Sequence, residues 1–151
     1  MDTMRASADF EVAGIVEPDE RRREALVASK TYGGVPLMTE EELLRAPGLQ
    51  AVAVETEVKD LVPTAARCIA AGKHIHLDKP AGESLPALRR LLDDATARKL
   101  TVQMGYMLRY NPAFELCRKL IHEGALGEIF SIEAAMGKIQ GDEEQIGRAH
   151  V

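Results

Sequence analysis

Short apolar runs alternate with segments of helical spacing along most of this 151-residue chain, and this alternation is the strongest constraint on its fold. Strands are predicted at 10–16, 35–38, 49–54, 74–77 and 100–104, with helices between them. Such an alternation is typical of repeated βαβ units built around a parallel sheet. We therefore predict an α/β fold with a doubly wound parallel sheet, and we expect the almost wholly apolar strand at 49–54 to be covered on both faces.

Start signals mark the predicted helices. Thr39 stands three residues before Glu42, which is a capping-box pattern. Ser84 is predicted to cap a long helix, and Asn111, followed by Pro112, to open the last one. The three long helices are predicted to bury apolar faces made of Leu61, Val62, Ala65, Ala66, Ile69 and Ala70, of Leu85, Leu88, Leu91, Leu92 and Ala95, and of Phe114, Cys117, Leu120 and Ile121.

Composition excludes several classes of protein. The net charge is −5, with 19 basic and 24 acidic residues, so we expect no nucleic-acid partner and no anionic membrane surface. No apolar run has transmembrane length, and the first seven residues contain no signal-like hydrophobic core. Cys68 and Cys117 are predicted to be buried free thiols in a reducing compartment, and the protein to be cytoplasmic.

Two motifs follow predicted strands. Leu77-Asp78-Lys79-Pro80 ends the strand at 74–77, and Gly105-Tyr106-Met107-Leu108-Arg109-Tyr110-Asn111-Pro112 follows the strand at 100–104. At this spacing the pair resembles the Gfo/Idh/MocA family of nicotinamide-dependent oxidoreductases, over about residues 8 to 137. The resemblance implies a Rossmann-like domain that binds NAD or NADP, a sugar, cyclitol or related polyol as substrate, and a homo-oligomer at full length.

A dinucleotide site needs a first strand, a glycine-rich turn and a helix start, and none of these precedes the strand at 10–16. We therefore expect an incomplete Rossmann-like sheet whose missing strand is central, from a gene that extends upstream; a naturally short protein is the alternative.

Residues 1–125 are predicted to be the partial dinucleotide-binding domain. Residues 126–145, with a strand at 129–135, are predicted to begin a second α+β domain. Residues 146–151 match one reading frame of a sequencing adapter and are predicted to be non-native; an ordinary polar tail is the alternative.

Lys79 is the predicted catalytic residue. Oxidation of a secondary alcohol by hydride transfer needs a base for the hydroxyl proton, and a lysine can serve when burial lowers its pKa. By resemblance, Lys79 also contacts substrate and the nicotinamide ribose, and Pro80 fixes the backbone there; the alternative is a surface lysine at a strand end. The family's other acid/base residues would lie beyond Ala135. His74 and His76 face one side of a strand, but they lack a third ligand and we predict no metal site.

The resemblance also implies cofactor contacts. Glu17, at the end of the second strand, is placed to accept the adenosine ribose hydroxyls, which favours NAD; helix capping is its alternative role. Arg21 to Arg23 could instead favour a 2′-phosphate. Thr56 lies beside the cofactor, although the flanking acids depart from the family's usual Thr-Pro. Asp78 replaces the usual Glu and, with Lys79 and Pro80, contacts the nicotinamide side, and Arg109 binds cofactor or substrate through its planar fork.

The sequence thus predicts a fragment of an NAD(P)-dependent dehydrogenase that transfers hydride between the cofactor and a sugar, cyclitol or polyol. The alternative is a non-enzymatic module of the same fold that senses a dinucleotide or sugar. We expect the fragment itself to be inactive, and residues 1–151 to give no NAD binding that calorimetry can measure.

Overall fold

The computed structural model describes residues 7–29, 32, 34–135 and 137. The chain divides into two compact units, Met1–Tyr106 and Met107–Val151. The first unit contains every strand in the described part of the chain, and the second contains two helices. The predicted limits at 125 and 145 stay predictions. The 146–151 tail lies outside the described residues.

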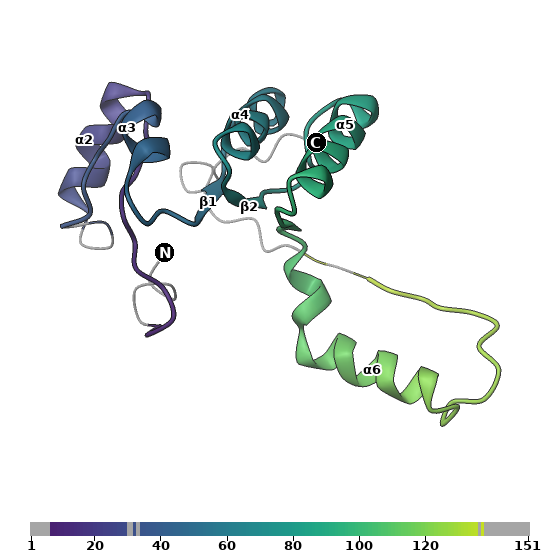
Figure 1. Ribbon diagram of the computed structural model, residues 1–151. Coiled ribbons are helices and arrows are strands. Elements are labelled where there is room, and N and C mark those ends of the chain that lie inside the picture. Colours follow the sequence, from purple (N-terminus) through teal and green to yellow (C-terminus); the bar gives the residue numbers. More distant parts are fainter. Residues whose placement is uncertain (1–6, 30–31, 33, 136, 138–151) are drawn as a thin grey trace. The chain divides into compact units, whose positions relative to one another are not determined.

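The first unit contains a parallel sheet of the order β1-β2-β3. Its strands are β1 (Ala51–Val54), β2 (His74–Leu77) and β3 (Val102–Met104). Helix α4 (Val58–Ala70) connects β1 to β2, and α5 (Leu85–Ala97) connects β2 to β3. The two helices pack against each other (Figure 1). The prediction of an α/β fold with a parallel sheet is therefore confirmed.

One face of this sheet forms the core. Because side chains alternate along a strand, Val54, Ile75 and Leu77 point to the face that α4 covers, and all three are buried. The opposite face of β1 carries Ala51 and Ala53, which are exposed. The expectation that this strand is covered on both faces is therefore wrong for the described residues. The core as a whole consists of Val54, Leu61, Val62, Ala65, Cys68, Ile69, Ile75, Leu77, Leu91 and Ala95.

The predicted helix starts are confirmed. Helix α3 (Glu40–Arg45) begins with the complete capping box of Thr39 and Glu42. The Ser84 hydroxyl caps α5. Three further helices are α2 (Glu20–Ala28), capped by Asp19, η1 (Met107–Tyr110), and α6 (Pro112–His122), capped by Asn111.

The predicted buried faces are confirmed only where a sheet lies beneath the helix. In α4 the alanines at 66 and 70 are exposed, because the core-facing stripe is narrower than predicted. In α5 the leucines at 85 and 92 are exposed for the same reason. In α6 none of the described side chains is buried, so the prediction is wrong for that whole face; Cys117 is exposed rather than buried. The second unit contains no sheet in its described part on which α6 could pack.

Three predicted strands do not form regular strands. The segments 10–16 and 35–38 share a single parallel bridge, Ile15 to Leu37, in which the Met38 N–H donates to the Ile15 oxygen over 2.9 Å. The segment 129–135 has no strand pairing among the described residues. A strand needs a paired neighbour, and two isolated segments form at best a marginal ladder. In the described part of the chain, this bridge is separate from the three-stranded sheet.

The described helices were compared with the length and hydropathy of a membrane-spanning helix. Among the described residues no helix combines the length and the apolar character that a bilayer crossing requires.

Candidate functional site

The loops that follow β1 and β2 meet at one edge of the sheet. Val54 and Leu77 are register partners in adjacent parallel strands, so both strands end side by side. The Asp78 N–H donates to the Val54 oxygen over 3.0 Å, which extends the pairing by one residue. The structure therefore brings the loop of Thr56 and the loop of Lys79 to the same carboxyl edge, where open α/β sheets bind ligands.

The turn after β2 is held against α4. The Ala81 N–H donates to the Asp78 oxygen over 3.3 Å, and the intervening Lys79–Pro80 peptide is cis. Gly82 has a φ of +81°, a conformation that side chains rarely adopt. A Cβ on Gly82 would lie 2.8 Å from a methyl carbon of Val62. Only glycine fits here, and this close packing fixes where the turn leaves the sheet edge.

Lys79 lies at the predicted place but in a different environment. The side chain is exposed, as is Pro80, whereas Asp78 is half-buried. The burial that the predicted base role requires is therefore not provided by the described residues of the first unit.

Gly105 lies close beside Asp78, a feature that sequence reasoning did not assign to the site. The Gly105 N–H donates to the Leu77 oxygen over 2.9 Å, which places this glycine next to the end of β2. A Cβ on Gly105 would lie 3.2 Å from Asp78 Oδ1 and 3.5 Å from His76 Nε2. The absence of a side chain on Gly105 therefore lets its backbone lie close to both polar groups, which are half-buried. Its position at the start of the second motif was the available signal.

The two strand histidines have separate partners. The Thr101 N–H donates to His74 Nδ1 over 2.9 Å, and His76 Nδ1 lies 3.4 Å from Gln103 Oε1. The described residues contain no group of three or more side chains able to hold a metal ion.

Glu17 and Thr56 each make a local hydrogen bond. The Asp19 N–H donates to Glu17 Oε1 over 2.9 Å just before α2. The side chain that caps α2 is Asp19, so Glu17 does not have the capping role named as its alternative. The Thr56 hydroxyl donates to the Glu57 carbonyl over 3.1 Å. Glu17 is half-buried and Thr56 is exposed. A carboxylate accepts several hydrogen bonds, so the Glu17 carboxylate retains acceptor capacity for a ligand.

An ion pair connects the first turn of α2 to the start of α4. Arg22 Nη2 lies 3.6 Å from Glu57 Oε1, and the two side chains are 65% and 67% exposed. Glu57 is the N-cap residue of α4 but makes no side-chain capping bond. The pair joins the loop of Glu17 to the loop of Thr56, which are far apart in sequence.

A second pair joins α3 to α4. The Arg67 guanidinium binds both oxygens of Glu40, with Nη2 at 2.9 Å from Oε2. This hydrogen bonding lowers the pKa of Glu40 and raises that of Arg67. The neighbouring Cys68 thiol has its pKa raised to about 11 by burial, so it stays protonated and unreactive.

Arg109 belongs to the second unit, where it lies exposed on η1. The structure therefore groups the segments of Glu17, Thr56 and Asp78–Pro80 in one unit. The role of Arg109 stays a prediction.

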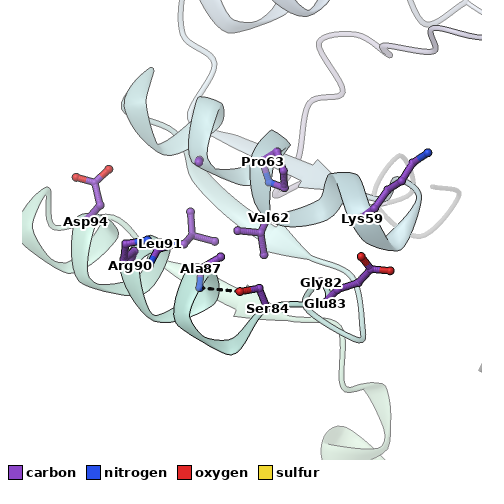
Figure 2. A pocket seen from close by; sticks show the side chains of 11 residues that line it. Lys59, Val62, Pro63, Gly82, Glu83, Ser84, Ala87, Arg90, Leu91 and Asp94 are labelled. Carbon is purple, nitrogen blue, oxygen red and sulfur yellow. Dashed lines mark hydrogen bonds between the residues drawn. The ribbon is translucent and has the colours of Figure 1, made fainter.

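A groove lies between α4 and α5, with a volume of about 500 Å³. Figure 2 shows its floor and its charged rim. None of the predicted site residues lines it. Its lining consists of Lys59, Val62, Pro63, Ala66, Gly82, Glu83, Ser84, Ala87, Arg90, Leu91 and Asp94.

Two curated proteins are similar to this chain in sequence. The chain is 28% identical over 109 residues to the trans-1,2-dihydrobenzene-1,2-diol dehydrogenase of Sus scrofa, covering 72% of this chain and 31% of that protein. It is 29% identical over 111 residues to the dTDP-3,4-didehydro-2,6-dideoxy-alpha-D-glucose 3-reductase of Streptomyces violaceoruber, covering 74% and 32%. The chain thus spans about a third of the length of these curated relatives.

Solved structures show the same fold. A putative myo-inositol dehydrogenase from Sinorhizobium meliloti matches with a TM-score of 0.73 and 25% identity, over 83% of this chain and 37% of that one. A variant 3-ketoreductase from Actinomadura kijaniata, solved with TDP-benzene and NADP, matches with a TM-score of 0.69 and 25% identity, over 83% and 39%.

The model of one protein family, described as an oxidoreductase family with an NAD-binding Rossmann fold, matches residues 1–106. This range comprises the whole first unit, with both loops at the carboxyl edge of the sheet. The chain therefore belongs to the Gfo/Idh/MocA family of oxidoreductases.

Proposed function

We propose that the carboxyl edge of β1 and β2 binds the nicotinamide cofactor of an oxidoreductase that transfers hydride to or from a sugar, cyclitol or related polyol. The observation that carries this proposal is the register of Val54 with Leu77, because it places the Thr56 and Lys79 loops side by side. The relatives' names, which include a diol dehydrogenase and a sugar-nucleotide reductase, support the substrate class.

The residues at this edge, together with Glu17 after the separate Ile15–Leu37 bridge, fit parts of a dinucleotide. Glu17 is a carboxylate with spare acceptor capacity for the adenosine ribose hydroxyls, and the Thr56 hydroxyl follows the neighbouring strand. Gly105 allows the backbone after β3 to lie close to Asp78. In this proposal the adenosine end contacts Glu17 and Thr56, and the nicotinamide end contacts Asp78, Lys79 and Pro80; the bound cofactor supplies the hydride acceptor.

Lys79 handles the proton in this proposal. Its ammonium follows β2 at the strand end, and its neutral amine would accept the hydroxyl proton as the substrate is oxidised. Because Lys79 is exposed in the first unit, other parts of the enzyme have to cover it before it can act as a base. Arg109 is proposed to bind the cofactor or a substrate oxygen.

We further propose that NAD is preferred to NADP. A carboxylate that accepts ribose hydroxyls repels a 2′-phosphate, and Glu17 has that place. The family also includes a 3-ketoreductase solved with NADP, so this preference is a property of the individual chain rather than of the fold. We also propose a cytoplasmic enzyme, which the free thiols support, without nucleic-acid or membrane partners, which the net charge of −5 supports. A homo-oligomer at full length completes the proposal.

A titration with NAD, followed by NMR of the ¹⁵N-labelled chain, tests the site. We expect weak, millimolar binding, below what calorimetry detects, with amide shifts confined to Glu17, Thr56, Asp78 and Lys79. The Lys79→Ala variant should lose the shifts around β2 and keep those at Glu17 and Thr56. Shifts spread over α4 and α5 instead, or none at millimolar NAD, would contradict the site.

Turnover tests the mechanism. In a protein of the relatives' full length that carries this segment, Lys79→Ala should lower kcat by about 100-fold or more and leave the Kd for NAD nearly unchanged. Lys79→Arg is the matched control, because it keeps the positive charge but cannot release a proton. Unchanged turnover in Lys79→Ala would remove this residue from the mechanism.

A further inference from the structure

We propose that the ion pair with Glu57 keeps the Arg22 guanidinium from binding the 2′-phosphate of NADP. In this way the Arg22–Glu57 pair sets the preference for NAD. This inference rests on the proposed function, because it assigns a specificity residue to the same cofactor site. It also explains why the arginines that follow Glu17 need not favour the phosphorylated cofactor.

The placement of Arg22 comes first. It lies in the first turn of α2, and its own N–H donates to the Asp19 side chain over 2.9 Å, which fixes the backbone at that point. Asp19 in turn donates its N–H to Glu17 Oε1. Arg22 is thus connected through two short hydrogen bonds to the carboxylate proposed to hold the adenosine ribose. A guanidinium carried by this turn would be the natural partner of a 2′-phosphate on a ribose held by Glu17.

The side chain of Arg22 is directed to another group. Its Nη2 lies 3.6 Å from Glu57 Oε1, beyond the usual range of a hydrogen bond but within that of an ion pair. Glu57 makes no side-chain capping bond to α4, and in the described part of the chain its carboxylate pairs with Arg22. A phosphate entering this space would have to displace Glu57 and would meet its negative charge as well as that of Glu17.

The neighbouring arginines are not equivalent. Arg23 lies on a different face of α2, in a shallow surface hollow with Glu20, Glu24 and Val27. In the described part of the chain, Arg22 is the arginine of this run that forms an ion pair. Removal of Glu57 should therefore release one specific guanidinium.

Binding of small nucleotides to the ¹⁵N-labelled chain tests the proposal. The probes are adenosine 2′-monophosphate, which carries the phosphate in question, and adenosine, which lacks it. Glu57→Gln should bind the monophosphate about five-fold more tightly than the unmodified chain, since an exposed ion pair of this kind is weak, and should bind adenosine equally well. The gain should shrink in high salt, which screens exposed charges.

Two variants serve as controls. Glu55→Gln removes the same charge from the same loop, but Glu55 forms no ion pair with Arg22 in the described structure, so it should give little gain. The double variant Glu57→Gln with Arg22→Gln should lose the gain altogether. The Arg22 side-chain Nε signal should shift on addition of the monophosphate in Glu57→Gln and much less in the unmodified chain.

The outcomes are distinct. If adenosine binds but Glu57→Gln leaves the affinity for the monophosphate unchanged, the inference fails and the proposed function stands. If Glu55→Gln gives the same gain as Glu57→Gln, a general charge effect replaces the specific pair and the inference also fails. If neither probe shifts the signals of Glu17 and Thr56 in any variant, the proposed cofactor site fails and this inference with it.

Discussion

Helices α5 and α6 have similar sequences in outline but different surroundings. Each begins at a side-chain cap and carries leucines at helical spacing. In α5, Leu91 and Ala95 are buried in the core that this helix shares with α4 and the sheet; in α6 no described side chain is buried, and Phe114 remains 55% exposed. An amphipathic pattern therefore predicts that a helix has an apolar face, but it says nothing about which part of the molecule covers that face.

The same contrast separates two parts of the first unit. From β1 to β3, each strand has a hydrogen-bonded neighbour and the connecting helices share a core. From residue 7 to 38, two apolar segments share a single bridge, and α2 buries no residue. Pairing and packing reinforce each other, so a segment without a neighbour forms only fragments of a strand.

The largest expected effect is on the β1–β3 core. Leu77 is fully buried, so Leu77→Ala should lower the free energy of unfolding by about 2–5 kcal/mol, through lost burial and the cavity left behind. Leu116→Ala in α6 is the matched control, because Leu116 is 57% exposed, and it should cost less than about 0.5 kcal/mol. Urea denaturation of both variants measures the difference. Equal losses would show that α6 is packed as well as the core.

The second largest effect is expected in the reactivity of the two thiols, Cys68 in the core and Cys117 on α6. Burial raises the pKa of Cys68 to about 11, whereas Cys117 is exposed on α6. The thiolate is the reactive form, so a maleimide at mildly alkaline pH should label Cys117 at least about 100-fold faster than Cys68. Mass spectrometry of timed samples measures the two rates, with labelling in denaturant as the control that equalises them. Rapid labelling of Cys68 in the folded chain would mean that α4 opens locally.

The sequence predicted the parts of the fold that depend on local chemistry. The Thr39–Glu42 capping box and the strand at 74–77 follow from side chains that act within a few residues, and both are present. The placement of Thr56 and Lys79 at one sheet edge followed from the rule for parallel strands. The sequence left open whether Lys79 is a buried base or a surface lysine, because burial depends on segments far away in sequence; in the first unit it is exposed.

Contacts between distant loops were also outside the reach of sequence reasoning. The pair Arg22–Glu57 joins residues 35 positions apart, and no spacing rule connects them. Gly105 stood inside a motif that was noticed, but its missing Cβ acquires a meaning only once Asp78 lies beside it.

Removal of the caps compares the two helices directly. Asn111 Oδ1 accepts from the Ala113 N–H over 2.9 Å, and α6 has little packing to compensate for its loss. Asn111→Ala should therefore destabilise α6 by about 1 kcal/mol, seen as faster amide exchange along the helix. Ser84→Ala, whose bond in α5 is longer at 3.4 Å, should have a smaller effect because the core holds that helix. Faster exchange in α5 than in α6 would reverse the comparison.

The smallest expected effect concerns the link between α3 and α4, which ties the poorly paired amino-terminal segments to the core. Arg67 lowers the pKa of Glu40 from its ordinary value of 4.5, so the pair stabilises the fold above that pH, and the contribution disappears as the pH falls through the lowered pKa. Glu40→Gln should cost about 0.5 kcal/mol at neutral pH, since both side chains are partly exposed, and almost nothing in acid. Urea denaturation across this pH range measures the gap. Glu41→Gln is the control, because among the described residues Glu41 pairs with Arg45 of the same helix and does not tie α3 to α4. A gap between Glu40→Gln and the unmodified chain that persists unchanged in acid would mean that packing, rather than this ion pair, joins the amino-terminal segments to the core.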